Sequence, residues 1–157
     1  MFLLDKLYMM LKKEQIDKAV LKFKKIDINI VYELLTKNCW KYGIQYEVII
    51  KTKDLIEVRL YSEREEVLFK FHKTPIVFIG EYNNFIDTLR ACKVRKGIYI
   101  TTGVFEEIIL KSHSKKFEGR KVILEDNFHF LKKQIWLKYK GKPLKFKELQ
   151  FYKYLPN

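Results

Sequence analysis

The segment Gly97-Ile-Tyr-Ile-Thr-Thr-Gly-Val-Phe-Glu-Glu107 decides the fold prediction for this chain of 157 residues. Its apolar run, Ile98 to Ile100, is too short for a helix and carries β-branched and aromatic residues, which is typical of a buried strand. Thr102 is a suitable helix N-cap, and Glu106 and Glu107 would then lie in the first turn, where the helix dipole favours acidic residues. The segment therefore predicts a strand, a tight turn and a helix.

Other segments extend this pattern on both sides. Lys121 to Leu131 again gives a short apolar strand, an acidic turn and a helix start. Upstream, three runs rich in β-branched or aromatic residues predict an antiparallel meander: 44–51, 55–61 and 67–71. Strands that are first antiparallel and then alternate with helices predict an α/β (α+β) fold, with a mixed central sheet flanked by helices.

The remaining helices follow from apolar spacing and capping residues. Residues 2–25 have helical spacing that is interrupted near Lys12-Lys13-Glu14, which predicts two short helices. A further helix would begin at Asp27 or Asn29 and end at Gly43. The apolar run 76–79 after Pro75 is either a strand or a buried connection, and the next helix would begin at Asn83 or Asn84.

We expect a single domain over residues 1–157. It would comprise an N-terminal helical arm (1–26), a core (27–133) and a basic, aromatic C-terminal extension (134–157).

The formal net charge of +13, from 32 basic and 19 acidic residues, suggests a polyanionic partner. Nucleic acid and an anionic membrane both fit, and a generally basic proteome is the alternative. No apolar stretch reaches the roughly 18 residues that a membrane span needs, and no signal-peptide pattern is present. Cys39 and Cys92 lack metal or disulfide spacing and indicate buried free thiols. We therefore expect a cytoplasmic, intracellular protein.

The C-terminal extension interleaves lysines with aromatic residues. This composition suits phosphate contacts combined with base stacking. The alternative is an edge strand pair with lysines outward and aromatic side chains inward. The candidate nucleic-acid-binding residues are Lys138, Lys140, Lys142, Lys145, Lys147, Trp136 and Tyr139.

Together with the strand Tyr42-Gly-Ile-Gln-Tyr-Glu-Val48, the two strand–turn–helix segments resemble the Mrr-type restriction endonuclease-like domain of the PD-(D/E)XK nuclease superfamily. The resemblance covers roughly residues 30–133 and implies a restriction-endonuclease-like core. It also implies hydrolysis of DNA phosphodiesters with Mg²⁺ or Mn²⁺. By position, Asp54 corresponds to the metal-binding aspartate, Lys70 to the catalytic lysine and Glu33 to the helix acid.

The catalytic motif departs from that family at Leu68, where an acid or amide is expected. Three explanations stay open. The site is inactive, or a neighbouring glutamate replaces the missing ligand, or the frame is shifted so that His72 or Lys73 takes the place of Lys70. The replacement candidates are Glu57, Glu66 and Glu81, with Asp54 and Glu66 as the expected metal ligands.

The leading hypothesis is a DNA-binding, metal-dependent DNA nuclease that acts on duplex DNA. The alternatives are an inactive nuclease-fold DNA-binding module, and a protein-interaction or structural module of a mobile element. A homodimer is left open.

Overall fold

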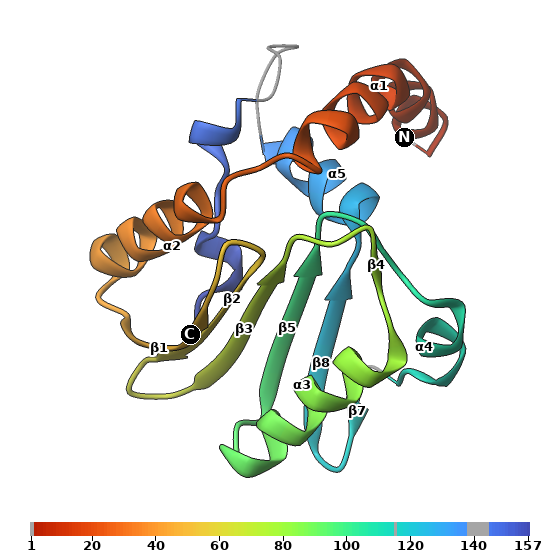
Figure 1. Cartoon of the computed structure of the whole chain (residues 1–157). Coiled ribbons are helices and arrows are strands. Elements are labelled where there is room, and N and C mark those ends of the chain that lie inside the picture. The colour runs from red at the N-terminus through yellow and green to blue at the C-terminus, as the bar shows by residue number, and fades with distance from the viewer. Residues whose placement is uncertain (1, 115, 138–144) are drawn as a thin grey trace.

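The computed structural model describes residues 2–114, 116–137 and 145–157. Its centre is a six-stranded mixed sheet with the strand order β1-β2-β3-β5-β8-β7 (Figure 1). Strands β1 to β3 are antiparallel, β5 and β8 run parallel to β3, and β7 is an antiparallel edge strand. The bounds are β1 Gln45–Lys51, β2 Leu55–Tyr61, β3 Glu66–His72, β5 Lys96–Thr101, β7 Lys116–Phe117 and β8 Arg120–Glu125. The predicted mixed sheet is confirmed, and the meander strands lie within one residue of their predicted bounds.

Five α-helices cover the sheet within the described residues: α1 Phe2–Phe23, α2 Ile28–Tyr42, α3 Ile79–Ala91, α4 Glu107–Ser112 and α5 Asn127–Leu137. Helices α2 and α5 lie on one face, and α3 and α4 lie on the other, whereas α1 lies beyond the carboxyl ends of the strands and joins the α2 face only through its C-terminal end (Figure 1). Two short parallel strands form a separate pair: β4 (Ile76–Val77), between β3 and α3, and β6 (Val104–Phe105), between β5 and α4.

Two apolar cores follow from the alternation of side chains along the strands. Phe69 and Phe71 point into the core beneath α2, which we call the α2-side core. Leu68 and Tyr99 point into the core beneath α3, the α3-side core. Lys70 lies between Phe69 and Phe71 in sequence, so its side chain emerges on the α3 side.

Strand β5 is the central strand that the sequence predicted, because residues 97–101 are buried on both faces. Gly97 allows α3 to pack closely on it, since an added Cβ would lie 2.8 Å from Leu89 Cδ1. The ends of α2 also agree with the prediction. Asp27 accepts a hydrogen bond from the Asn29 N–H at 2.9 Å, and Gly43 ends the helix in the left-handed region, with φ of 67°.

The structure corrects the predicted starts of three helical segments. Helix α1 is continuous, because Lys and Glu are good helix formers and no Gly or Pro interrupts the polar residues near position 13. Helix α3 begins at Ile79, where Glu81 accepts a hydrogen bond from the Phe78 N–H. Thr102 caps no helix, because β6 pairs with β4 first and α4 starts only at Glu107.

The C-terminal extension contributes to the α2-side core. Residues 134–137 belong to α5, and residues 145–157 form two 3₁₀ turns, η1 Phe146–Glu148 and η2 Tyr152–Tyr154, with no strand. Phe151 is fully buried and stacks on Phe130 of α5 at 5.9 Å between ring centres. Aromatic side chains in this described part therefore stabilise the fold. Of the predicted nucleic-acid-binding residues, Lys145 and Lys147 are exposed; Lys138, Tyr139, Lys140, Lys142 and the side chain of Trp136 lie outside the described residues.

Candidate functional site

Two opposite charges are buried on the α3 side of the sheet. Glu57 on β2 lies directly opposite Lys70 on β3. Only 3% of Glu57 and 7% of Lys70 is exposed to solvent. Burying a charged side chain is costly unless another group compensates it, so such a pair needs an explanation beyond packing.

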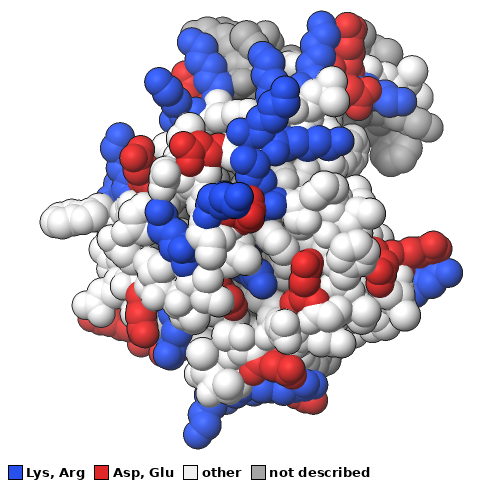
Figure 2. Space-filling view, viewed as in Figure 1, with Lys and Arg blue, Asp and Glu red and all other residues white. Residues whose placement is uncertain are grey.

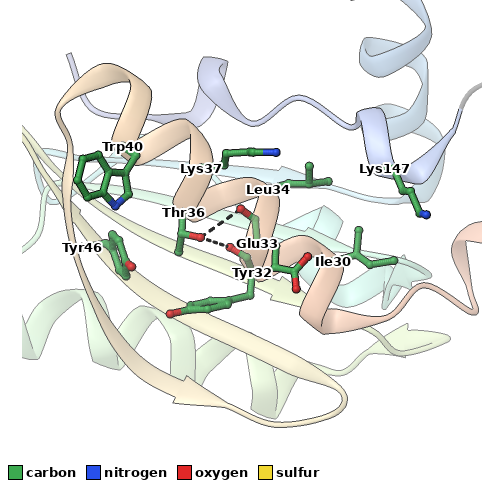
Figure 3. A pocket seen from close by; sticks show the side chains of 9 residues that line it. All are labelled: Ile30, Tyr32, Glu33, Leu34, Thr36, Lys37, Trp40, Tyr46 and Lys147. Carbon is green, nitrogen blue, oxygen red and sulfur yellow. Dashed lines mark hydrogen bonds between the residues drawn. The ribbon is translucent and has the colours of Figure 1, made fainter.

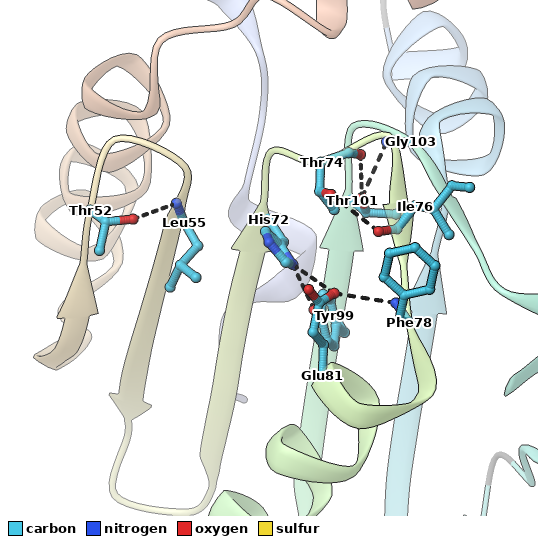
Figure 4. A network of polar contacts seen from close by, with 10 residues as sticks. All are labelled: Thr52, Leu55, His72, Thr74, Ile76, Phe78, Glu81, Tyr99, Thr101 and Gly103. Carbon is cyan, nitrogen blue, oxygen red and sulfur yellow. Dashed lines mark hydrogen bonds and ion pairs between the residues drawn. The ribbon is translucent and has the colours of Figure 1, made fainter.

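Three further polar side chains adjoin this pair. His72 Nδ1 is hydrogen-bonded to the Tyr99 hydroxyl at 2.8 Å and lies 3.9 Å from Glu81 Oε2 at the start of α3 (Figure 4). The Lys70 ammonium lies 4.9 Å from the centre of the Tyr99 ring, a favourable cation–π distance. Glu57, Lys70, His72, Glu81 and Tyr99 form what we call the buried polar cluster.

Burial dominates the electrostatics of the cluster. It raises the pKa of Glu57, while the Lys70 charge acts in the opposite direction. It lowers the pKa of Lys70, opposed by Glu57 and Glu81, and it lowers the pKa of His72, opposed mainly by Glu81. Glu57 Oε1 is buried and has no hydrogen-bond partner among the residues that the structure describes. Perturbed titrating groups beside an unsatisfied polar atom are characteristic of functional sites.

Sequence reasoning named three members of the cluster, Glu57, Lys70 and Glu81, and the structure brings them together. Asp54 lies close to them, in the turn before β2, where its carbonyl accepts a hydrogen bond from the Lys73 N–H at 2.7 Å. Its charge is one of the groups that raise the pKa of His72.

The structure does not bring the other candidates to this place. Glu66 stands at the opposite end of β3, where it binds Arg59 at 3.0 Å. Asp54 and Glu66 are thus separated by the length of β2, about 20 Å, and cannot share a metal ion. Glu33 is exposed on α2, whose buried residues pack on the α2-side core. Leu68 is fully buried in the α3-side core, so this position serves packing.

The two acids expected as ligands of the implied Mg²⁺ or Mn²⁺ centre, Asp54 and Glu66, do not meet in this structure. Within the described ranges, no group of three or more His, Cys, Asp or Glu side chains is arranged to hold a metal ion. Divalent cations of this type need several oxygen ligands.

The second feature is a concentration of lysines at the carboxyl ends of β3, β5 and β8. The α1–α2 connection and the β1–β2 hairpin also reach this edge, because Lys51 Nζ donates to Asn29 Oδ1 at 2.7 Å and Lys73 follows β3 directly. In Figure 2 the Lys and Arg side chains gather in the upper half of the view. We call this surface the basic edge and define it by Lys24, Lys25, Lys51, Lys53, Lys73 and Lys132, all at least partly exposed.

The chain matches no protein-family model and no curated protein sequence. None of its described helices has the length and apolar character that crossing a membrane requires.

Sequence reasoning missed Tyr99 and considered His72 only as a replacement for Lys70 in a shifted frame. Tyr99 stands inside the apolar run of β5, where an aromatic residue indicates packing. Its role follows only from the register of the parallel strands β3 and β5, in which Tyr99 lies beside Lys70 and Thr101 lies beside His72.

Proposed function

We propose that the protein binds nucleic acid through the basic edge, with duplex DNA as the principal partner. The observation that carries this proposal is the gathering of lysines from separate segments at one edge of the sheet, in a chain of net charge +13. Ligands of open α/β sheets bind outside the carboxyl ends of the strands, where this edge lies. Lysines bind phosphates without reading sequence, so we expect affinity with little sequence preference.

Two acidic groups near this edge, Glu125 and Asp126, are paired, which reduces their opposition to the lysines of the basic edge. Glu125 binds Lys133 and accepts a hydrogen bond from the Tyr154 hydroxyl. Asp126 lies 2.6 Å from His129 Nδ1. Duplex DNA carries one negative charge per roughly 1.7 Å of its axis, which matches a surface with several separate lysines.

The test compares two double substitutions that remove the same charge. Lys53→Gln/Lys73→Gln alters the basic edge, and Lys93→Gln/Arg95→Gln alters exposed residues before β5, at the opposite end of the sheet. The edge variant should flatten the slope of log K against log salt by about 2 units, at roughly 0.9 per lost phosphate contact. The control variant should leave the slope nearly unchanged. Equal effects would show that only overall charge matters, and absence of binding at low salt would refute the proposal.

Cleavage of phosphodiester bonds at the buried polar cluster is the second candidate function. Its support is the position of Lys70 and His72 near the carboxyl end of β3, next to the basic edge. A lysine held there can stabilise the charge that develops on a phosphate in the transition state. His72 and Glu81 provide groups able to accept or donate a proton.

The cleavage assay uses supercoiled and linear DNA with Mg²⁺, Mn²⁺ or EDTA. The variants are Lys70→Met, Glu57→Gln, Glu81→Gln and Asp54→Ala, with Glu66→Gln as the matched control at the far end of β3. Cleavage lost in the Lys70 and Glu57 variants, but kept with Glu66→Gln, would support a nuclease. Intact DNA binding without cleavage under any condition would favour an inactive nuclease-fold DNA-binding module.

A further inference from the structure

A hollow of about 800 Å³ lies along the exposed side of α2 and reaches the edge strand β1 (Figure 3). A neighbouring hollow of about 560 Å³ shares Trp40 and Tyr46 with it. Trp40 is 84% exposed and Tyr46 36% exposed. A tryptophan is seldom so exposed, because its large apolar surface is normally covered. We call the two hollows together the α2 groove.

Aromatic and basic side chains both line this groove: Figure 3 shows Tyr32 and Tyr46 on one side of α2, and Lys37 and Lys147 on the other. Tyr32 lies between Trp40 and the basic edge. The Tyr46 hydroxyl donates a hydrogen bond to Tyr32, and this bond is the largest cause that raises the pKa of Tyr46. Lys37 and Lys147 line the larger hollow from α2 and η1. Lys51 of the basic edge reaches Tyr32, with its ammonium 5.3 Å from the ring centre. The groove is thus continuous with the surface proposed above to bind phosphates.

We propose that the α2 groove binds single-stranded nucleic acid by stacking bases on Trp40 and Tyr46. This inference rests on the proposed function and adds a substrate class to it: duplex DNA that continues into an unpaired strand. Aromatic faces hold bases of any sequence, and nearby lysines follow the backbone. From Tyr32 to Trp40 the helix rises about 12 Å, which is room for about three or four bases stacked 3.4 Å apart.

The charge around the groove distinguishes this occupant from a protein. Lysine is depleted in protein–protein interfaces, whereas the groove carries Lys37 and Lys147 with Lys51 at its end. The competing occupant is a second copy of the chain, because β1 is an exposed edge strand with apolar Val48, Ile49 and Ile50. The experiment below separates the two.

The first measurement is tryptophan fluorescence during titration with an oligothymidylate. The chain has two tryptophans, so a Trp136→Phe variant reports on Trp40 alone. Stacking should quench this signal, and Trp40→Phe should lose the quenching while it retains part of the affinity. Trp40→Ala should weaken single-strand binding about tenfold and leave duplex affinity within about twofold, since base–aromatic stacking contributes 1–3 kcal/mol per base.

Glu33 gives a test of opposite sign. It lines the larger hollow, where its carboxylate repels phosphate. Glu33→Gln should therefore tighten single-strand binding about two- to fivefold, because it removes this repulsion. The matched control, Glu63→Gln in the exposed β2–β3 turn, should have no such effect.

Each remaining outcome decides between the proposals. Two results would refute the groove and leave the proposed function intact, provided that the protein binds duplex DNA. One is an unchanged single-strand affinity in Trp40→Ala, and the other is the absence of Trp40 quenching by the oligothymidylate. Failure to bind either form would refute both. Self-association that Trp40→Ala abolishes, with single-strand affinity unaltered, would overturn the inference in favour of a second copy on β1.

Discussion

Removing either charge from the Glu57–Lys70 pair should destabilise the fold, with opposite pH dependences for the two variants. The two residues are direct cross-strand neighbours and both are buried. Unit charges about 6 Å apart attract by about 3 kcal/mol at an effective dielectric constant of about 20. Each single substitution loses this attraction and leaves the other charge buried, so we expect a loss of about 2–4 kcal/mol in unfolding free energy near neutral pH.

The direction of each pH trend follows from proton linkage. The folded-state pKa of Glu57 already lies above its ordinary value of 4.5, and Lys70→Met removes the charge that opposes this rise. The folded state then binds more protons than the unfolded state, and the stability of Lys70→Met should fall as pH rises above 4.5. Glu57→Gln removes the charge that best supports protonated Lys70, whose folded pKa is already below 10.5. Here the unfolded state binds more protons, so stability should rise as pH increases toward 10.5.

Urea unfolding, followed by circular dichroism between about pH 5 and pH 9, measures both trends. The double variant Glu57→Gln/Lys70→Met should be more stable than the sum of the single losses predicts, by about 3 kcal/mol, if the charges interact. Glu66→Gln is the control, because its partly exposed pair with Arg59 should contribute only about 1 kcal/mol. Parallel pH trends in the two single variants, or additive losses, would refute the electrostatic argument.

Three packing predictions can be checked by calorimetry or circular dichroism. Gly103→Ala should lower the free energy of unfolding by about 3 kcal/mol or more and Tm by about 6–12 °C, because the new Cβ would lie 2.1 Å from the Pro75 carbonyl oxygen. The control Gly80→Ala, whose new Cβ meets nothing within 4 Å, should raise the free energy of unfolding by about 0.5–1 kcal/mol. Ile98→Asp and Ile100→Asp should each prevent folding through an unpaired charge in the central strand, and a native circular dichroism spectrum for both would contradict this packing. Phe151→Ala should cost about 3–5 kcal/mol, whereas an unchanged Tm would show that the C-terminal extension does not support the α2-side core.

The sheet could be predicted from sequence because its signals are local. The meander strands are β-branched and aromatic runs separated by polar turns, and the burial of β5 on both faces makes residues 98–100 continuously apolar. The end of α2 needs only the left-handed glycine at position 43. The missed start of α4 depends on non-local pairing, that of Val104 and Phe105 with β4.

The candidate site could be predicted only in part, since its assembly depends on strand register. Glu57 and Glu66 are equally plausible acids in sequence, yet the β2–β3 register places Glu57 opposite Lys70 and Glu66 at the far end. Composition also could not separate core from binding surface. Phe151 alternates with lysines as a stacking residue would, and the structure buries it.

The β1–β2 hairpin lies between the α2 groove and the buried polar cluster. On one side Lys51 reaches Asn29 and Tyr32 of α2 and leads to the α2 groove. On the other side β2 carries Glu57 into the buried polar cluster, next to Lys70. A duplex held on the basic edge would meet the hairpin tip, where Lys53 is exposed, at the point from which both surfaces begin. Both proposals together therefore place the junction between paired and unpaired DNA strands at the hairpin tip. Lys53→Gln should consequently lower the affinity for forked DNA more than the affinity for the duplex or for the single strand.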